Sequence, residues 1–442
     1  MVLPPGPSSS ALLQTLAWVR RPVRLMRACR AAYGPTFRLR FAGGRDFVFV
    51  TRPEHVKEVF TADPGLVLAG RANAAFARFM GPHSLFALDG EAHRRHRRLL
   101  VPPFHGERMR AYGPLLVALT RRHLARWPRG RPFSLTAALQ ALTLDAIFEA
   151  VFGVTDARTM ARLTGLVARL TSRASALLAF VPFLRLDLGP WSPWGRFVRC
   201  RAELDAILFE AIARARRAGG EDILAKLIEE SVRRGEPLGD DELRDELLTL
   251  LGAGHETTAT GLAWTLSRLL AAPAALERAR AEVQEVVGQA DPSAEHLPRL
   301  TFLDAVVQEA LRLDPPVPIA VRQLAAPARL AGYDLPADTR LAPCIWLAQR
   351  DPEAFPDPDA FRPERFLGAR RGPAAAFTWF PFGGGARVCI GMAFALFEMK
   401  LILATLLQAA RLRPAAAFSG RAERHAIVLT PAGGAPVTLE DA

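Results

Sequence analysis

Apolar residues recur three and four positions apart through most of residues 104 to 285, with Gly or Pro at intervals that suit helix ends. Before this region, two strand-like segments at residues 37 to 41 and 47 to 50 flank the sequence AGGRD, which predicts a β-hairpin. The pattern therefore predicts a mainly α fold with small β-sheets.

The longest helical pattern covers residues 240 to 273 and is apolar nearly all round in its middle, so it should run through the core. Its middle reads GAGHETT, in which Gly252, Gly254, a histidine, an acid and two threonines are costly choices for a buried helix. A local departure of this kind inside a consistent helix is expected at a functional site.

The C-terminal third changes character, because from about residue 314 the sequence is Pro-rich and irregular. An apolar helical pattern returns at Ala393. Between them lies FPFGGGARVCIG, residues 380 to 391, in which one cysteine is surrounded by glycines. Gly costs conformational entropy on folding, so a backbone this permissive predicts the close approach of a large group.

Composition bounds the class of protein. A chain of 442 residues that is half apolar, with Gly and Pro spread throughout and no internal repeat, is expected to form one continuous domain over residues 1 to 442. The formal charge of +13 is carried almost entirely by arginine, and lysine occurs only at Lys57, Lys226 and Lys400. No recognised nucleic-acid-binding module accompanies this charge, so we expect no nucleic-acid partner.

The cysteines and the N-terminus indicate the compartment. Cys29, Cys200, Cys344 and Cys389 lie far apart without a C-x-x-C pair, which argues against disulfides and a zinc site and favours a reducing cytoplasm. The first 21 residues contain neither a run long enough to span a bilayer nor a convincing signal-peptide core. We expect a soluble protein with no membrane span, while peripheral contact with a membrane stays open.

Cys389 is the first candidate for chemistry. It precedes a predicted helix N-terminus, and Arg387 is nearby; both features should lower the pKa of the thiol toward thiolate, which can ligate a metal. Taken alone, the loop is also consistent with a buried, inert cysteine.

The flanking residues favour the metal ligand. Phe382, Gly385, Arg387, Cys389 and Gly391 match F-x-x-G-x-R-x-C-x-G, and this pattern resembles the haem-binding loop of the cytochrome P-450 family, in its soluble bacterial form. The resemblance implies haem b (iron protoporphyrin IX), with Cys389 as the axial ligand, Arg387 paired with a propionate and Phe382 beside the sulfur. Thiolate ligation favours O–O cleavage. The glycines would bring the loop against the porphyrin and free backbone N–H groups for the sulfur.

The centre of the long helix also resembles that family. Ala253, Gly254, Glu256 and Thr257 match A-G-x-E-T of its oxygen-binding helix, which implies that Glu256 and Thr257 deliver protons to dioxygen. Thr257 can back-bond to the carbonyl of Ala253 and open the helix locally. His255 either lines the distal pocket or is a packing choice.

A charged motif lies between these two segments. Glu309 and Arg312 are three apart on one helix face and can pair. With the PERF arginine, Arg365, they resemble the family's buried network behind the haem. We interpret all three as structural, because a buried charge network can fix an arrangement while contributing little net stability.

The strongest basic cluster is EAHRRHRRLL, residues 91 to 100. His93 and Arg97 are four apart and can point at one anion, and the resemblance implies that they bind haem propionates, as Arg322 would. The resemblance implies no haem contact for Arg94, Arg95 and Arg98. They form either a solvated helix face or a surface for an acidic redox partner. At Gln349 the family often has histidine, and we assign no functional consequence to this difference.

The sequence thus predicts the cytochrome P-450 fold, a triangular helical prism around haem, and a monooxygenase that inserts one oxygen atom of dioxygen into a hydrophobic small molecule. A ferredoxin and its reductase would supply electrons to a monomer. The alternatives are a peroxide-driven haem-thiolate hydroxylase and a non-catalytic haem-thiolate sensor.

By the same resemblance, the roof of the substrate pocket would be formed by residues 71 to 88 and 176 to 195. The aromatic residues Phe180, Phe183, Trp191 and Trp194 would line a pocket for a fatty acid, terpenoid or polyketide, or simply pack in the roof.

Overall fold

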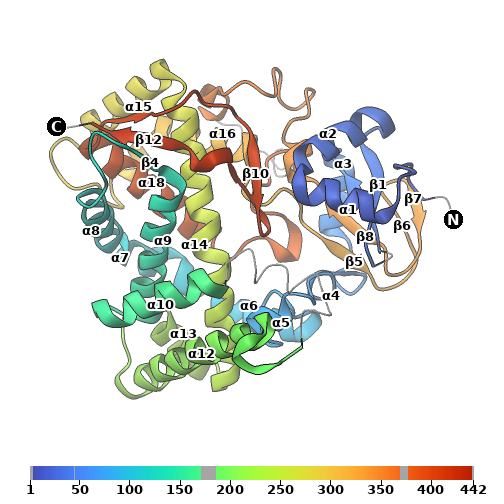
Figure 1. Ribbon diagram of the computed structural model, residues 1–442, viewed down its shortest axis with the longest axis horizontal. Helices are drawn as coiled ribbons and strands as arrows, with labels where there is room; N and C mark the ends of the chain where they lie inside the picture. The colour runs from blue at the N-terminus through green and yellow to red at the C-terminus, as the bar shows by residue number, and fades with distance from the viewer. Residues whose placement is uncertain (1–2, 44, 171–185, 369–376, 441–442) are drawn as a thin grey trace.

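The computed structural model describes residues 3–43, 45–170, 186–368 and 377–440 (Figure 1). The described helices are α1 (Ala11–Arg20), α2 (Pro22–Tyr33), α3 (Pro53–Thr61), α4 (Ala69–Ala72), α5 (Ala77–Met80), α6 (Gly90–Leu100), α7 (Gly106–Ala111), α8 (Gly113–Leu124), α9 (Leu135–Phe152), α10 (Ala157–Leu170), α12 (Pro193–Ala218), α13 (Ile223–Arg233), α14 (Asp240–Leu270), α15 (Pro273–Val286), α16 (Thr301–Leu313), α17 (Ile345–Ala348) and α18 (Met392–Ala409). The described strands are β1 (Thr36–Phe41), β2 (Arg45–Val50), β3 (Val67–Leu68), β4 (Pro132–Ser134), β5 (Arg322–Leu324), β6 (Ala328–Leu330), β7 (Tyr333–Leu335), β8 (Arg340–Pro343), β9 (Leu412–Pro414), β10 (Ala422–His425), β11 (Val428–Pro431) and β12 (Pro436–Leu439). The prediction of a mainly α fold with small sheets is confirmed.

The predicted hairpin forms the edge of the largest sheet. β1 and β2 pair antiparallel, with Thr36 opposite Val50. β2 then runs parallel to β8, and the strand order is β1-β2-β8-β5-β3. This sheet and α1 to α3 lie on one side of the molecule, and α8, α9, α10, α12 and α13 lie on the other (Figure 1). Arg322, the first residue of β5, is buried.

Three smaller sheets complete the strands described here. They are the pair β6-β7, the pair β10-β11, and a sheet of order β4-β12-β9. The β10-β11 hairpin is joined to α14, because the indole Nε1 of Trp264 donates to the carbonyl of Leu429 at 2.7 Å.

The long helix α14 crosses the middle of the molecule, as predicted (Figure 1). Its first turn holds three carboxylates, which the helix dipole favours, and Glu242 accepts the Gly239 N–H at 2.9 Å. The helix ends at Leu270, three residues before the predicted end. Pro273 begins α15, and the residue before a proline is disfavoured in helical conformation, so Ala272 is not helical, with φ −126° and ψ 80°.

α14 belongs to both large apolar cores. Leu247 and Leu251 pack with residues of α9, α10, α12 and α13, whereas Leu262 and Leu266 pack with residues of α8, α15, α16 and α18. The sequence GAGHETT lies between these two sets of residues. The fold therefore buries both ends of α14 in apolar cores, and packing in these cores does not account for its polar centre.

Two described helices, α9 and α18, are long and apolar enough to cross a membrane by length and composition alone. Their residues are 67% and 61% buried inside the protein, which is the pattern of core helices. α18 begins at Met392, one residue before the predicted start, and follows directly on the cysteine loop.

Candidate functional site

The cysteine loop, residues 380 to 391, is closed by its own backbone. The Cys389 N–H donates to the carbonyl of Phe382 at 3.0 Å, and a single 3-10 turn at Gly385–Arg387 lies inside this closure. Gly391 is the N-cap of α18. Cys389 thus lies directly before a helix N-terminus, as the sequence predicted, and Phe382 packs against Trp379 at the loop entrance with ring centroids 6.3 Å apart.

Two of the loop glycines are required by α3. A Cβ on Gly385, whose φ is +66°, would lie 2.0 Å from the carbonyl oxygen of Phe60, and one on Gly384 would lie 2.5 Å from the Phe60 ring. Only glycine permits this approach. Gly391 differs, because a Cβ there would have the Cys389 sulfur as its nearest neighbour at 3.9 Å. The predicted contact of these glycines with a porphyrin stays a prediction, but for Gly384 and Gly385 close packing on α3 already accounts for the residue type.

All four cysteines carry free thiols, and Cys389 is the exposed one. Many protein atoms nevertheless surround it, and burial raises the pKa of its thiol, while the Gly391 N–H and the charge of Arg97 act in the opposite direction. The predicted lowering toward thiolate by the helix terminus and Arg387 is therefore wrong for the protein without a metal. The thiol is nevertheless accessible, and coordination to a metal ion deprotonates such a thiol outright.

The residues predicted to bind anionic groups come together from three elements, namely α6, β5 and the cysteine loop: His93, Arg97, Arg322 and Arg387. Burial and the charges of the three arginines lower the pKa of His93 to about 3, so its ring is neutral. Burial also lowers the pKa of both Arg322 and Arg387 to about 10. The cluster is crowded with positive charge.

The hydrogen bonds of these arginines leave that charge largely unbalanced. Arg97 donates to the carbonyl of Val388 at 2.8 Å, and Arg322 donates to the carbonyls of Val321 at 2.9 Å and Gly384 at 3.3 Å. Within the described residues, a carboxylate bonds directly to Arg387 alone, through Asp89 at 2.5 Å. Buried charges require partners. A group with two carboxylates beside a thiol-ligated metal fits these residues, which is the chemistry of haem.

Asp89 is a site residue that the sequence did not reveal. Besides Arg387, it accepts the backbone N–H groups of Gly70 at 2.8 Å and Arg71 at 2.7 Å. It is also the N-cap of α6, where Asp is an ordinary choice, yet its side chain caps nothing in that helix. Because its position at an N-cap already explains an Asp here, the local sequence gives no sign of its partner Arg387, which lies 298 residues away.

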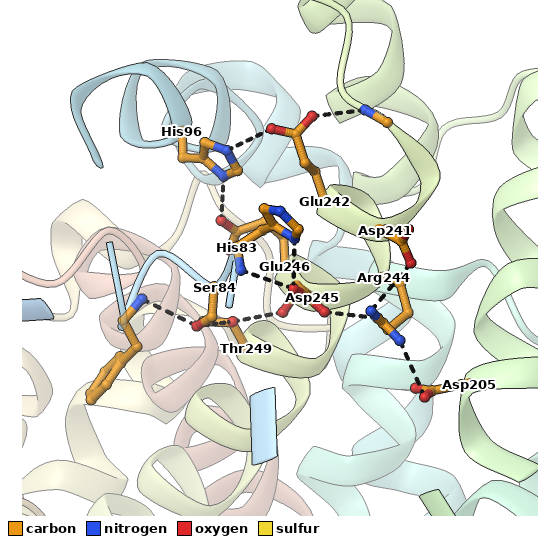
Figure 2. Close-up of polar contacts among 12 residues, drawn as sticks. His83, Ser84, His96, Asp205, Asp241, Glu242, Arg244, Asp245, Glu246 and Thr249 are labelled. Carbon is orange, nitrogen blue, oxygen red and sulfur yellow. Dashed lines mark hydrogen bonds and ion pairs between the residues drawn. The ribbon is translucent and has the colours of Figure 1, made fainter. Parts of the chain in front are cut away.

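Two adjacent buried carboxylates of α14 contact the segment before α6 and α6 itself (Figure 2). Asp245 accepts the backbone N–H of His83 at 2.9 Å and contacts its ring Nδ1 at 3.1 Å, and Glu246 contacts the ring of His96 at 2.7 Å. Thr249 donates to Ser84 at 2.6 Å. Since Arg387 donates to the carbonyls of Leu85 and Leu88, this segment connects α14 to the cysteine loop.

His96 strengthens the same connection from α6. Its ring contacts Glu246 at 2.7 Å and Glu242 at 3.1 Å (Figure 2). Burial alone would lower the pKa of His96, but the hydrogen bonds and charges of Glu246 and Glu242 outweigh burial and raise it. The basic run of α6 thus contains one histidine directed at the arginine cluster and another that ties α6 to α14.

The leftover arginines of that run are paired within the chain. Arg94 bonds Glu91, Arg95 bonds Glu242, and Arg98 bonds Glu236, each at 2.6 Å. Arg94 and Arg98 remain 62% and 44% exposed. A contact with a redox partner would therefore compete with these internal pairs.

The polar centre of α14 has the predicted back-bond, because the Thr257 hydroxyl donates to the Ala253 carbonyl at 2.6 Å. A Cβ on Gly254 would come within 2.8 Å of Ile147, so this glycine allows α9 to approach, and its predicted contact with a cofactor stays a prediction. His255 is buried, and its Nδ1 contacts the Leu251 carbonyl at 2.8 Å on its own helix.

Glu256 has a partner that the sequence did not indicate. Its carboxylate is hydrogen-bonded to Nδ1 of His425 on β10, which lies 169 residues away. Glu256 is buried, with a side chain 11% exposed, whereas the His425 side chain is 34% exposed. The predicted acid is therefore hydrogen-bonded to a side chain that is more exposed than its own.

The charged network of α16 is present and buried. Arg312 donates to both carboxylate oxygens of Glu309, at 2.6 and 2.8 Å, and both side chains are fully buried. Arg365 joins at 3.3 Å. Gln349, to which the sequence gave no role, donates to the carbonyls of Leu311 and Arg312 at 3.0 Å and accepts the Phe380 N–H at 2.8 Å. It connects the α16 network to the start of the cysteine loop.

The two segments predicted to roof a pocket each contact the ring of Phe197, which lies two residues beyond the second segment. The Phe79 ring lies edge-on to Phe197 at 5.3 Å, and Trp194 stacks on the same Phe197 at 5.4 Å. Trp191 is 88% exposed. Phe180 and Phe183 lie outside the described residues.

The comparisons with known proteins agree with this geometry. Residues 4–435 match the family model of cytochrome P450. The chain is 34% identical to cytochrome P450 135B1 of Mycobacterium tuberculosis, over 99% of this chain and 92% of that protein. It is 38% identical to cytochrome P450 135A1 of the same organism, over 91% of this chain and 87% of that protein.

Two solved structures share the fold. Retinoic acid bound cyanobacterial CYP120A1 matches with a TM-score of 0.86 and 27% identity, covering 99% of both chains. The haem domain of cytochrome P450DA matches with a TM-score of 0.87 and 24% identity, covering 100% of this chain and 98% of that chain.

Proposed function

The chain belongs to the cytochrome P450 family of haem-thiolate monooxygenases, and from this premise we propose that it oxygenates a fatty acid, terpenoid or polyketide of secondary metabolism by hydroxylation or epoxidation. Haem b, when bound, supplies the iron at which dioxygen is reduced and cleaved. The reaction consumes two electrons and two protons and yields the oxygenated product and water.

One observation carries the proposal, namely the accessible thiol of Cys389 beside an arginine cluster with too few carboxylates. In the proposed site, Cys389 holds the iron. Arg97, Arg322 and Arg387 bind the propionates, and neutral His93 donates a hydrogen bond to one of them. The Gly391 N–H, which interacts with the sulfur, moderates its charge.

The centre of α14 is proposed to manage protons. The Thr257 hydroxyl, bonded to the Ala253 carbonyl, keeps the local helix hydrogen-bonding pattern open for water. Glu256, on the next residue, would hold a proton at its carboxylate and pass it toward Thr257. A buried acid and an alcohol together can shuttle protons while the apolar surroundings exclude bulk water.

An apolar substrate is supported by the aromatic contacts between Phe79, Trp194 and Phe197. The solved relative with retinoic acid holds an apolar ligand with one carboxylate. We further propose that the protein acts as a cytoplasmic monomer and receives electrons from a ferredoxin and its reductase, with Arg94 and Arg98 as exposed cations on one face.

The test of the ligand is spectroscopic. Reduced protein under carbon monoxide should show the strongly red-shifted absorption band of thiolate ligation, and Cys389→Ser should lose it. A band at the ordinary haem position in the wild type would contradict the proposal.

The test of the reaction uses isotope-labelled dioxygen with ferredoxin, its reductase and a panel of lipids, terpenoids and polyketides chosen by their shift of the haem spectrum. One labelled oxygen atom in the product supports monooxygenation. Turnover with peroxide but not with reduced ferredoxin would indicate a peroxide-driven hydroxylase, and spectral binding without any product would indicate a sensor.

A further inference from the structure

We propose that the outward face of α1, which consists of Leu12, Leu13, Leu16 and Val19, docks on a lipid bilayer with anionic headgroups. Exposed arginines at the end of α1 and the start of α2 face those headgroups. The ten residues of α1 extend only about 15 Å, so the helix lies on the bilayer and does not span it. The inference does not depend on which substrate the proposed monooxygenase oxidises.

The first observation is that α1 turns polar side chains toward the protein. Gln14 is buried and accepts the Arg40 N–H of β1 at 2.8 Å, and Thr15 accepts the Ala42 N–H at 2.8 Å. A surface helix ordinarily has the opposite arrangement, with polar residues in water and apolar residues against the protein. Turning α1 to bury its leucines would break these bonds, so they fix the orientation of the helix.

The second observation is that the other side of α1 is apolar. Leu12, Leu16 and Val19 follow the spacing i, i+4, i+7 and therefore share one face, with Leu13 beside them. These four side chains are between 42% and 71% exposed. Single exposed apolar residues are ordinary, whereas a contiguous patch beside polar residues marks an interaction surface. The fold itself gives no reason for leucine at these positions.

The third observation is the charge beside this face. No Asp or Glu occurs in residues 1 to 45. Arg20, Arg21 and Arg24 are exposed, and no carboxylate pairs with any of them within the part of the chain that the structure describes. The next arginine, Arg27, already has a carboxylate partner. An apolar helix face next to unpaired arginines is typical of helices that bind anionic membranes.

The size of the face favours a lipid surface over a second copy of the chain. A helix about 15 Å long and 10 Å wide offers roughly 150 Å², whereas a stable interface takes about 800 Å² from each partner. Binding to a bilayer has no such threshold, because it scales with the apolar area that enters the interface and with the attraction of the charges. A soluble polyanion would pair with the arginines and leave the leucines in water.

One pair of variants tests the apolar face. Leu12→Gln/Leu16→Gln removes two of its side chains and replaces them with a residue of similar helix propensity. Val198→Gln/Val232→Gln is the matched control, because these exposed valines lie on α12 and α13. The carbon monoxide band and thermal unfolding establish that each variant is folded and loaded.

A second pair of variants tests the charges. Arg20→Gln/Arg24→Gln removes two unpaired cations beside α1. Arg158→Gln/Arg299→Gln is the matched control, because both arginines are exposed and, among the described residues, neither has a carboxylate partner. Both double variants lower the net charge of the protein by the same amount, so a difference between them reports position and not total charge.

Binding is measured by flotation with vesicles of phosphatidylglycerol and phosphatidylcholine in equal parts, and with vesicles of phosphatidylcholine alone. The wild type should bind the mixed vesicles more tightly, and added salt should weaken this binding. The leucine variant should bind at least tenfold more weakly. The arginine variant should lose roughly tenfold to thirtyfold, since each charge near an anionic surface contributes about fivefold. Both controls should match the wild type.

The position of α1 on the vesicle is measured separately. Cys29, Cys200 and Cys344 are buried, and Cys389 holds iron in the proposed site, so a nitroxide can be attached at Leu16→Cys. Mixed vesicles should protect this label from a water-soluble nickel complex and increase its collisions with oxygen. A label at Val232→Cys should not change. Equal accessibility at Leu16→Cys with and without vesicles would overturn α1 as the docking face.

The remaining outcomes each decide against the proposal. Absence of wild-type binding, or equal binding to both kinds of vesicle, overturns it. Loss of binding in the arginine variant alone would show adsorption by charge without insertion of the apolar face. Light scattering without lipid should show a monomer; a dimer that the leucine variant abolishes would show that a second copy covers this face.

Discussion

The guanidinium of Arg387 and the carboxylate of Asp89 lie 2.5 Å apart, and the same carboxylate accepts two backbone N–H groups at the start of α4. One acidic side chain thus joins the cysteine loop, α4 and the segment before α6. It also neutralises one arginine of a cluster that otherwise bonds carbonyl oxygens.

Asp89→Asn should weaken haem retention. The amide keeps the shape but loses the charge, and its N–H₂ group must face a donor, which leaves a buried group unsatisfied at a cost of about 1–3 kcal/mol. We expect haem transfer to excess apomyoglobin to accelerate by roughly fivefold to a hundredfold. Asp63→Asn, which affects an exposed turn to Gly65, is the control. Equal transfer rates for the two variants would contradict the role of Asp89.

Gly385→Ala should prevent stable folding of the cysteine loop. Its Cβ would lie 2.0 Å from the Phe60 carbonyl oxygen, and backbone atoms cannot move aside cheaply. Gly383→Ala is a matched control, because Gly383 also has a positive φ, +73°, but nothing within 4 Å. The control should lose about 1 kcal/mol from backbone strain, and Gly385→Ala several times more, measured by urea unfolding. Similar losses would show that strain alone explains both glycines.

Glu309→Gln should be strongly destabilising. It leaves the fully buried Arg312 with one partner fewer and no opposite charge, for which a loss of about 3–5 kcal/mol is typical. Arg365→Gln should cost less, since this arginine is partly exposed and its bond is 3.3 Å. The exposed pair Arg329–Asp334 gives the reference, and Asp334→Asn should cost about 0–1 kcal/mol. Circular dichroism during urea unfolding measures all three.

Glu398→Gln should alter the pH dependence of stability. Burial raises the pKa of Glu398 to about 8, and one of its oxygens has no hydrogen-bond partner. Between roughly pH 4.3, the unfolded value, and pH 8 the folded state keeps a proton that the unfolded state has lost. Wild-type stability should therefore fall as pH rises through this window.

The glutamine cannot ionise, so the variant should gain in Tm relative to the wild type as pH is raised from 5 to 8. Exposed Glu107→Gln should follow the wild type throughout. A pH-independent difference between Glu398→Gln and the wild type would show that the carboxyl is ionised in the folded protein.

The parts of the site that sequence predicts are those encoded within a few residues. The cysteine loop, the centre of α14 and the Glu309–Arg312 pair are local patterns, and the structure places each where its pattern indicates. The thiol pKa was predicted in the wrong direction, because the helix terminus and Arg387 are visible in the sequence and the burial of Cys389 is not.

Contacts between distant segments explain the rest. Asp89, Gln349 and His425 meet their partners only after the chain has folded, and each has an unremarkable local context. Gly384 and Gly385 were attributed to a porphyrin, although Phe60, more than 300 residues earlier, already requires them. Tertiary approach is invisible to periodicity, so these residues could be found only from the structure.

The position of β12 has a consequence for biosynthesis. This strand, Pro436–Leu439, lies between β4 and β9, and it supplies the partner that β4, at residues 132–134, needs. During translation β4 must wait for about 300 further residues before it can pair. A ribosome that stops short of β12 leaves two unpaired edges, so truncated chains should be recognised by chaperones and proteases even when every haem-binding residue has already been made.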